Sequence, residues 1–334
     1  MSPSLATVSI DQLRLLTKIA VLYHEESYSQ AEVSEKLNLS QARVSRYLKH
    51  AVELGIVRTS VIQPAGIYVG LEKALEEKYG LREVVVVEMV EGASVENRLG
   101  SSAAKYLETT LETTDFIGIS SWSNTLVATV EAMRSRPRKI VTGVAQLIGG
   151  IGSPQAQAQA TRLISHLAEL TSARPYYLNA PGIASSHDLQ QAFLGDPTVA
   201  ATVAAWDKLT TLLVGVGTFP ASPFFAASGN ALLDDEESEL ASDGAVGEIC
   251  LRYFDASGSP MHPKIESRMV SIEAAAMLAV PRRIGVAGGI SKLSAVRAAI
   301  TGGWVNVLIT DSRLAAELLE RPRFVVSTKA TRAH

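Results

Sequence analysis

The chain has 334 residues and a formal net charge of −3 at pH 7, with 47% hydrophobic and 19% charged residues. Its length is enough for two domains and its apolar content for a substantial core. The slightly acidic balance excludes general affinity for nucleic acid, so any contact with DNA must come from a local basic patch.

The single cysteine, Cys250, excludes an internal disulfide and fits a reducing compartment. The start of the chain lacks the pattern of a signal peptide, and no apolar run reaches the length that spans a membrane. The sequence therefore predicts a soluble cytoplasmic protein without membrane partners.

Three helices are predicted at the amino-terminal end. Residues 10–24 place apolar side chains at helical spacing, and residues 29–57 read SQAEVSEKLNLSQARVSRYLKHAVELGIV. Ser29, with a glutamate three residues later, has the pattern of a capping box at a helix start. The turn at 38–40 separates this helix from the next one, for which Ser40 is the expected N-cap.

The last of these helices has two distinct faces. Val44, Leu48 and Ala51 form its apolar stripe, and Gly55 stands where a left-handed C-cap is expected. Residues 36–52 contain four Lys or Arg residues and no Asp or Glu. Arg and Lys can bind phosphates, and Gln and Arg near a helix N-terminus can read base edges. The residues expected to contact DNA are Ser40, Gln41, Arg43, Ser45, Arg46 and Lys49.

A short turn followed by a basic, capped helix is typical of a helix-turn-helix. Residues 56–62, IVRTSVI, would add a small wing. The alternative is an ordinary pair of helices with a solvated basic face. The agreement of turn, caps and charge favours a winged helix-turn-helix DNA-binding domain over residues 1–64.

From residue 65 to residue 334, strand-like and helical segments alternate. After a helix in GLEKALEEKYGL, strands are predicted in REVVVVEMV, DFIGISS, KIVTGVAQLIGG, RPYYLNAP, DKLTTLLVGVGTF, GEICLRYFD, RRIGVAGGI and VNVLITD. Continuous apolar strands followed by helices are the signature of a parallel sheet covered on both faces. The sequence predicts a Rossmann-like α/β domain over residues 65–334.

Ligands of open parallel sheets bind beyond the carboxyl ends of the strands, so the loops there are the candidates for a site. The loop 120–125, SSWSNT, lies between a predicted strand and a helix N-terminus, where hydroxyls and free N–H groups can hold a phosphate. Ordinary capping of that helix explains this loop equally well. The candidate residues of the loop are Ser120, Ser121, Ser123, Asn124 and Thr125.

Two glycine-containing loops are weaker candidates. Gly149 and Gly150 in LIGGIGS permit close approach of a ligand to the backbone, although a tight turn is the more frequent explanation. Gly217 and Thr218 in GVGTF again place a hydroxyl at a strand end.

Charged candidates come from two later loops. Glu248 and Asp255 are possible acceptors for sugar hydroxyls, although surface carboxylates are usually only solvated. Lys292 follows two glycines in VAGGISKLSAV and falls in the first turn of a predicted helix. A lysine in the first turn is electrostatically unfavourable, because the helix N-terminus carries partial positive charge, unless an anion binds alongside. Lys292 is therefore the strongest single candidate for binding an anion.

The sequence lacks the signatures of the common catalytic sites. Its six histidines show no metal spacing, GISSW lacks the closing glycine of a nucleophile elbow, and P-loop and dinucleotide fingerprints are absent. No lysine lies between Lys139 and Lys208, which excludes a Schiff-base lysine in that stretch. With no convincing acid–base pair, we predict no catalytic residue, metal or cofactor.

Taken together, the order and spacing of several segments resemble the SorC family of bacterial transcriptional regulators over nearly the whole chain. The segments are the helix pair, LEKALEEKYGLREVVVV, IGISSWSNTL, AQLIGGIG, LLVGVGTF, GAVGEICLRYFDASG and GGISKLSAVRAAITGGWVNVLITD. The resemblance implies a winged-helix head and an effector domain like sugar-phosphate isomerases and deaminases, assembled as dimers or tetramers.

By the same resemblance, the effector is a phosphorylated sugar or a related carbohydrate. The loop 120–125 and Lys292 would hold its phosphate, and Glu248 and Asp255 would face its hydroxyls. The family often has a glycine in place of Ser123, so a polyol or a free sugar remains open as the effector.

The sequence leaves three functions to distinguish. The favoured one is a sequence-specific transcriptional regulator, not an enzyme, whose binding to operator DNA is controlled by a sugar, polyol or sugar phosphate. The main alternative is an isomerase-like enzyme of sugar phosphates with an accessory helix-turn-helix. An architectural DNA-binding protein without a ligand would leave the large second domain and its polar loops unexplained.

Overall fold

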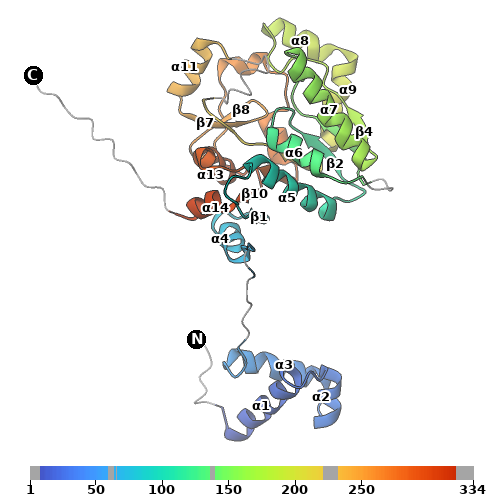
Figure 1. Ribbon diagram of the computed structural model, residues 1–334, viewed down its shortest axis with the longest axis vertical. Helices are drawn as coiled ribbons and strands as arrows, with labels where there is room; N and C mark the ends of the chain where they lie inside the picture. Colours follow the sequence, from blue (N-terminus) through green and yellow to red (C-terminus); the bar gives the residue numbers. More distant parts are fainter. Residues whose placement is uncertain (1–7, 59–63, 65, 136–139, 221–231, 321–334) are drawn as a thin grey trace, which may run out of the picture. The chain divides into compact units, whose positions relative to one another are not determined.

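The structure is a computed structural model that describes residues 8–58, 64, 66–135, 140–220 and 232–320 (Figure 1). The chain divides into two compact units, Met1–Gln63 and Pro64–His334. No helix in the described ranges is long and apolar enough to cross a membrane. The same ranges hold no group of His, Cys, Asp and Glu side chains suited to a metal ion.

The first unit contains helices α1 (Ile10–His24), α2 (Gln30–Leu37) and α3 (Gln41–Glu53), packed around Ile19, Val33 and Val44. The capping box at the start of α2 is confirmed, because the Ser29 N–H donates to the Glu32 carboxylate at 2.7 Å. The described helices therefore begin and pack as local sequence patterns predict.

Both ends of α3 were also predicted. Ser40 occupies the predicted N-cap position of α3. Its hydroxyl makes no capping hydrogen bond there, so only the position was predicted correctly. Gly55 follows the helix with φ of +74°, the left-handed conformation expected of it. Most of the predicted wing at 56–62 lies outside the described residues.

In the second unit, seven parallel strands form one sheet in the order β1-β10-β9-β5-β2-β3-β4. They are β1 (Glu83–Val87), β2 (Phe116–Ile119), β3 (Gly143–Gln146), β4 (Arg174–Tyr176), β5 (Thr211–Val214), β9 (Arg282–Val286) and β10 (Val307–Asp311). The predicted parallel α/β architecture is confirmed.

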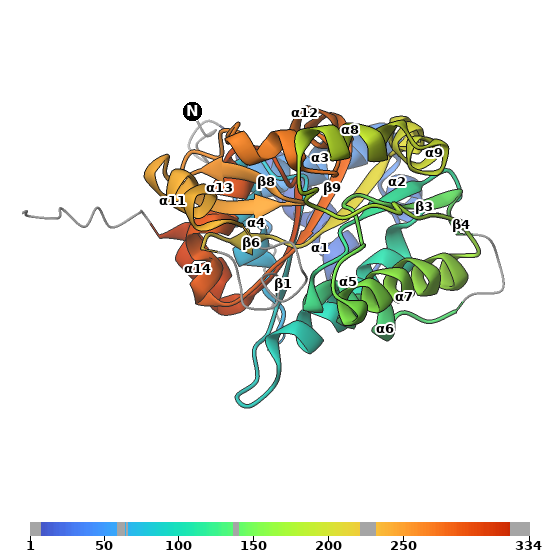
Figure 2. The same ribbon diagram turned by 90° about the horizontal axis from the view of Figure 1, so that it is seen from above.

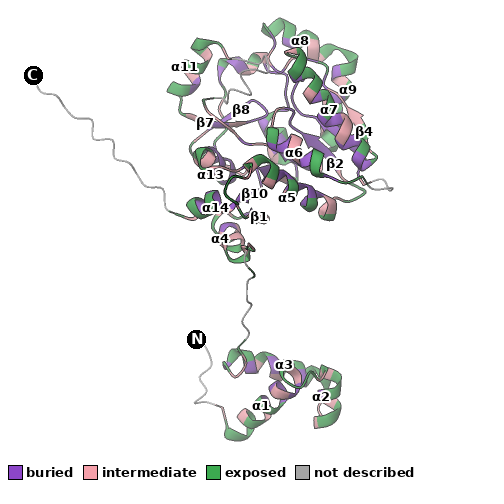
Figure 3. Cartoon of the chain, in the orientation of Figure 1, coloured by how far each residue is buried: buried purple, intermediate pink, exposed green. Residues whose placement is uncertain are grey.

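Helices cover both faces of this sheet (Figure 2). One side carries α5 (Val95–Thr110), α6 (Asn124–Ala132) and α7 (Pro154–Thr171); the other includes α12 (Ala274–Ala279) and α13 (Leu293–Thr301). Strand side chains alternate between the two cores: Leu308 faces α13, whereas Val307 and Ile309 face α5. The strands therefore lie in the buried interior (Figure 3).

Two short helices close the β1 edge of the sheet, α4 (Val69–Tyr79) and α14 (Ser312–Leu319). Glu72 and Glu76 of α4 accept hydrogen bonds of 2.9 Å from the backbone N–H groups of Val86 and Val84. These carboxylates satisfy N–H groups that an edge strand would otherwise present for pairing with another chain. Further helices are α8 (His187–Gly195), α9 (Pro197–Ala205) and α11 (Asp234–Ser242).

The segment 247–255 differs from its prediction. It was predicted as one strand of the parallel sheet, but it folds into the antiparallel hairpin of β7 (Ala245–Ile249) and β8 (Arg252–Asp255), which joins β6 (Gly217–Thr218) in a separate sheet. Cys250 and Leu251 form the turn with φ of +53° and +67°. Two-residue hairpin turns need positive φ, which usually calls for Asn or Gly, so Cys-Leu provided no turn signal.

Candidate DNA-binding and effector-binding sites

The charged face of α3 is accessible. Val44, Leu48 and Ala51 are buried, whereas all the predicted DNA-contacting residues are exposed. The Arg43 guanidinium donates to the Tyr47 hydroxyl at 3.2 Å, and this bond restrains the arginine side chain. Within the described ranges no hydrogen bond or ion pair engages Arg46. This face therefore has the residue types and exposure that contact with DNA requires. The exposed residues are Ser40, Gln41, Arg43, Ser45, Arg46 and Lys49.

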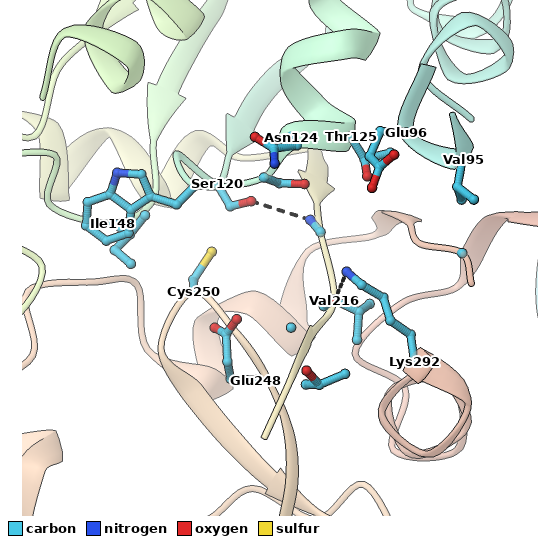
Figure 4. Close-up of a pocket in the computed structure, with 16 residues that line it drawn as sticks. Val95, Glu96, Ser120, Asn124, Thr125, Ile148, Val216, Glu248, Cys250 and Lys292 are labelled. Carbon is cyan, nitrogen blue, oxygen red and sulfur yellow. Dashed lines mark hydrogen bonds between the residues drawn. The ribbon is translucent and has the colours of Figure 1, made fainter. Parts of the chain in front are cut away.

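A pocket of about 250 Å³ lies where β2, β5 and β9 end, against the hairpin β7–β8 and the start of α13. Ser120 and the start of α6 line one side, Glu248 another, and Lys292 faces them (Figure 4). This is the crevice in which ligands of open parallel sheets bind. The pocket brings together these predicted residues: Ser120, Ser123, Asn124, Thr125, Gly217, Thr218, Glu248 and Lys292.

Four predicted residues do not line the pocket. The Ser121 hydroxyl is fully buried and donates to the Ile148 carbonyl at 3.5 Å. Gly149 and Gly150 have no room for a Cβ, because the backbone of Ala180 and Pro181 packs against the first and the Gln146 amide against the second. These glycines therefore permit close packing of the chain on itself.

Asp255 lies at the other end of β8, away from the turn that lines the pocket. Its carboxylate accepts from the N–H groups of Ser257 and Ser259 at 2.8 and 3.0 Å, and the Ser257 hydroxyl lowers its pKa. Asp255 thus organises its own turn. Glu248 lies beside the turn of the hairpin, whereas Asp255 is the last residue of β8. The two side chains are therefore at opposite ends of the hairpin.

Lys292 is the cation that lines the pocket. It is the N-cap residue of α13, and its ammonium donates to the Val216 carbonyl at 2.7 Å. Burial lowers its pKa, while the nearby carboxylates of Glu248 and Glu96 oppose that effect. A partly buried ammonium with one backbone partner retains donors for a ligand, since an ammonium has three.

Glu248 is held in place by the hairpin turn. The N–H of Leu251 donates to its carboxylate at 2.8 Å. Burial raises the pKa of Glu248, whereas the Leu251 N–H and Lys292 lower it. A Cβ at Gly217 would collide with the other carboxylate oxygen, so only glycine leaves room for Glu248 at this position.

The loop before α6 combines capping with an open helix terminus. The Ser123 hydroxyl accepts from the Leu126 N–H at 3.4 Å, as expected of an N-cap, and the Ser120 hydroxyl accepts from Gly215 N–H at 3.4 Å. The first N–H groups of a helix have no carbonyl partner within it and favour anions. The α6 terminus therefore has both features, so capping does not preclude anion binding.

Sequence reasoning missed several lining residues. Gly215 and Val216 belong to the same GVGTF motif as two predicted residues, and Glu96 follows the first strand of the sheet, so motif position could have indicated them. Cys250 had no such signal because the hairpin turn was not recognised. The lining residues missed are Val95, Glu96, Trp122, Ile148, Gly215, Val216, Cys250 and Gly288.

The exposed basic helix and the polar pocket together are typical of DNA-binding proteins that respond to a small ligand. A family model described as "Putative sugar-binding domain" matches residues 65–320, and a winged helix-turn-helix DNA-binding model matches residues 19–58. The chain belongs to the SorC family of bacterial transcriptional regulators. It is a transcriptional regulator that joins a DNA-binding domain to a sugar-binding domain.

Individual relatives match over most of the chain. The deoxyribonucleoside regulator of Bacillus subtilis is 32% identical over 311 residues, covering 92% of this chain and 98% of the relative. The sorbitol operon regulator of Klebsiella pneumoniae is 30% identical over 318 residues, with the same two coverages.

Solved structures agree. The full-length sorbitol operon regulator SorC of Klebsiella pneumoniae gives a TM-score of 0.70 at 27% identity, covering 94% of this chain and 100% of that one. A domain of the transcriptional regulator DeoR from Pseudomonas syringae pv. tomato gives 0.61 at 35% identity, covering 76% and 99%.

Proposed function

We propose that α3 binds operator DNA and that a phosphorylated sugar in the pocket controls this binding. The observation that carries the proposal is the meeting of Lys292, the α6 N-terminus and Glu248 in one pocket. Lys292 and the hydroxyls of Ser123 and Thr125 supply donors for a phosphate, and Glu248 supplies an acceptor for sugar hydroxyls. The names of the relatives, which refer to deoxyribonucleosides and sorbitol, support a carbohydrate effector.

The protein acts as a homo-oligomer in this proposal. Two DNA-binding domains related by a two-fold axis would contact half-sites separated by about one helical turn or a multiple of it. The effector changes operator affinity only if it binds one arrangement of the oligomer more tightly than another.

The first experiment is fluorescence anisotropy with DNA from upstream of the protein's own operon, at fixed salt. We expect specific binding, shifted by one member of a panel of sugars, polyols and sugar phosphates. A shift by a polyol or a free sugar alone would replace the phosphorylated effector with the second candidate. Specific binding that no compound shifts would contradict effector control.

An isomerase-like enzyme is the competing function. The relatives are regulators, which favours binding over turnover. Incubation of the protein with aldose and ketose phosphates is expected to give no product. Turnover that disappears in a Glu248→Gln variant would contradict the assignment as a regulator.

We further propose that α14 connects the pocket with α4, the helix that follows the DNA-binding unit along the chain. Asp311 is buried and caps α14 by accepting from the N–H groups of Arg313 and Leu314 at 3.0 and 2.9 Å. Its other oxygen accepts from the Gly289 N–H at 2.6 Å, next to the pocket-lining Gly288. One carboxylate thus links the pocket loop to the start of α14.

The other end of α14 is bonded to α4. The Lys78 ammonium donates to the carbonyls of Leu318 and Leu319 at 2.8 and 2.9 Å, and the Tyr79 hydroxyl donates to Leu318 at 2.7 Å. A helix with polar contacts at both ends is a physical route by which a ligand can bias α4.

The double variant Lys78→Met/Tyr79→Phe tests this route. We expect unchanged effector affinity in the absence of DNA, and a loss of about 0.5–2 kcal/mol in the coupling between effector and operator. The coupling is measured as operator Kd with and without the most effective compound of the panel. Lys73→Met, also on α4 and paired with the exposed Glu77 of the same helix, is the matched control. Normal coupling in the double variant would rule out this route.

A further inference from the structure

A second hollow of the same unit lies between α6 and α7, in the helical layer that covers one face of the sheet (Figure 2). Its volume is about 390 Å³, larger than that of the pocket at the strand ends. The floor is apolar, formed by the buried Val130 and Leu163 and the half-buried Val127. We call this hollow the α6–α7 groove.

The packing of α6 explains why the groove stays open. A Cβ at Gly100 of α5 would lie 2.7 Å from the backbone of Ala128 on α6, so these two helices are in close contact. On its α7 side, α6 leaves Val127 half-exposed in the groove. Apolar surface that is framed by polar rims is typical of a site where another protein binds.

The two rims of the groove carry opposite charges. Glu131 lies on the α6 rim and Arg162 on the α7 rim, and both are exposed. In the part of the chain that the structure describes, neither side chain takes part in an ion pair or a hydrogen bond. A small-molecule site usually has polar groups that converge inside a cavity, whereas these charges stand in solvent. The groove therefore suits a protein partner better than a small ligand.

The surface of α7 beside the groove is free of charge. Residues 153–161 read SPQAQAQAT and contain no charged side chain. Ala158, in the middle of this stretch, lines the groove and is exposed. Short uncharged side chains let another helix approach closely, and the centres of protein interfaces are depleted of charge. This part of α7 can therefore be covered without removing a charge from water.

We propose that a second copy of this chain covers the α6–α7 groove, related to the first by a two-fold axis that runs along the groove. This symmetry places α7 of each copy against α6 of the other. Glu131 of one protomer then meets Arg162 of its partner, and the same pair forms twice. The inference rests on the homo-oligomer of the proposed function and names the face that holds two copies together.

Exchanging the two charges tests this pairing, with the association of the full chain measured by sedimentation velocity over a series of concentrations. Glu131→Arg and Arg162→Glu each place like charges against one another across the interface. We expect each change to raise the dissociation constant of the oligomer by about ten-fold or more. The double variant restores opposite charges, so its dissociation constant should return to within about three-fold of the wild-type value. Glu237→Arg, at an exposed position of α11 outside the groove, is the control for the changed net charge.

Single variants that associate like the wild type would overturn the inference and leave the groove to a different protein or a small ligand. Folded single variants that dissociate, without recovery in the double variant, would overturn it too, because the two residues would then not face each other. In both cases the proposed regulator keeps its oligomer through another face. A wild-type chain that stays monomeric with and without operator DNA would refute the proposed homo-oligomer and this inference with it.

Discussion

Replacing Arg46 with alanine is expected to weaken operator binding by about ten-fold or more while the affinity for the effector stays unchanged. Arg46 is exposed on the charged face of α3, opposite the buried Val44 and Leu48. A lost contact to a base edge costs about 1–3 kcal/mol of discrimination between sequences. A lost contact to a phosphate instead lowers the slope of log affinity against log salt concentration by about one.

The measurement is fluorescence anisotropy of the specific operator and of an unrelated DNA, each over a series of salt concentrations. Arg14→Ala on α1 is the matched control, because it removes the same charge from an exposed helical position. If the two variants lose the same affinity, only net charge matters and the assigned role of Arg46 is wrong. A loss confined to the specific operator would identify Arg46 as a base-reading residue.

Replacing Lys292 with methionine is expected to shift the response to the effector to much higher concentrations, with operator binding retained. The ammonium is the pocket's cation, and hydrogen bonds to charged groups contribute about 1.5–3 kcal/mol. Effector affinity should therefore fall by roughly 10- to 150-fold. Methionine keeps the apolar stem of the side chain, so packing near Val216 changes little.

Titration of the effector into the protein–operator complex measures this loss, and thermal unfolding verifies that the variant is folded. Lys208→Met, at an exposed lysine outside the pocket, is the control for the lost charge. A normal response by the Lys292 variant would show that the anion does not bind in this part of the pocket. The phosphate would then have to bind elsewhere along the α6 terminus.

Much of the pocket lining was predicted from strand-end loops, because parallel strands present their carboxyl ends at one edge. Ser120, Ser123, Glu248 and Lys292 come from three segments far apart in the sequence, and the fold brings them together. Asp255 shares a motif with Glu248 but lies at the other end of β8. Its local sequence could not show this, because the hairpin turn at Cys250 and Leu251 has no conventional turn residue.

The sequence by itself determined the helices of the first unit, the alternation of strands and helices, and the expected DNA-binding face of α3. Caps, apolar periodicity and charge patterns act over a few residues, so the local sequence contains them. Only the tertiary structure decided that β2 lies between β3 and β5, that α4 covers the β1 edge, and that Lys292 meets Ser120 and Glu248 in one pocket. These arrangements depend on packing between segments as distant as residues 117 and 211, which no local pattern encodes.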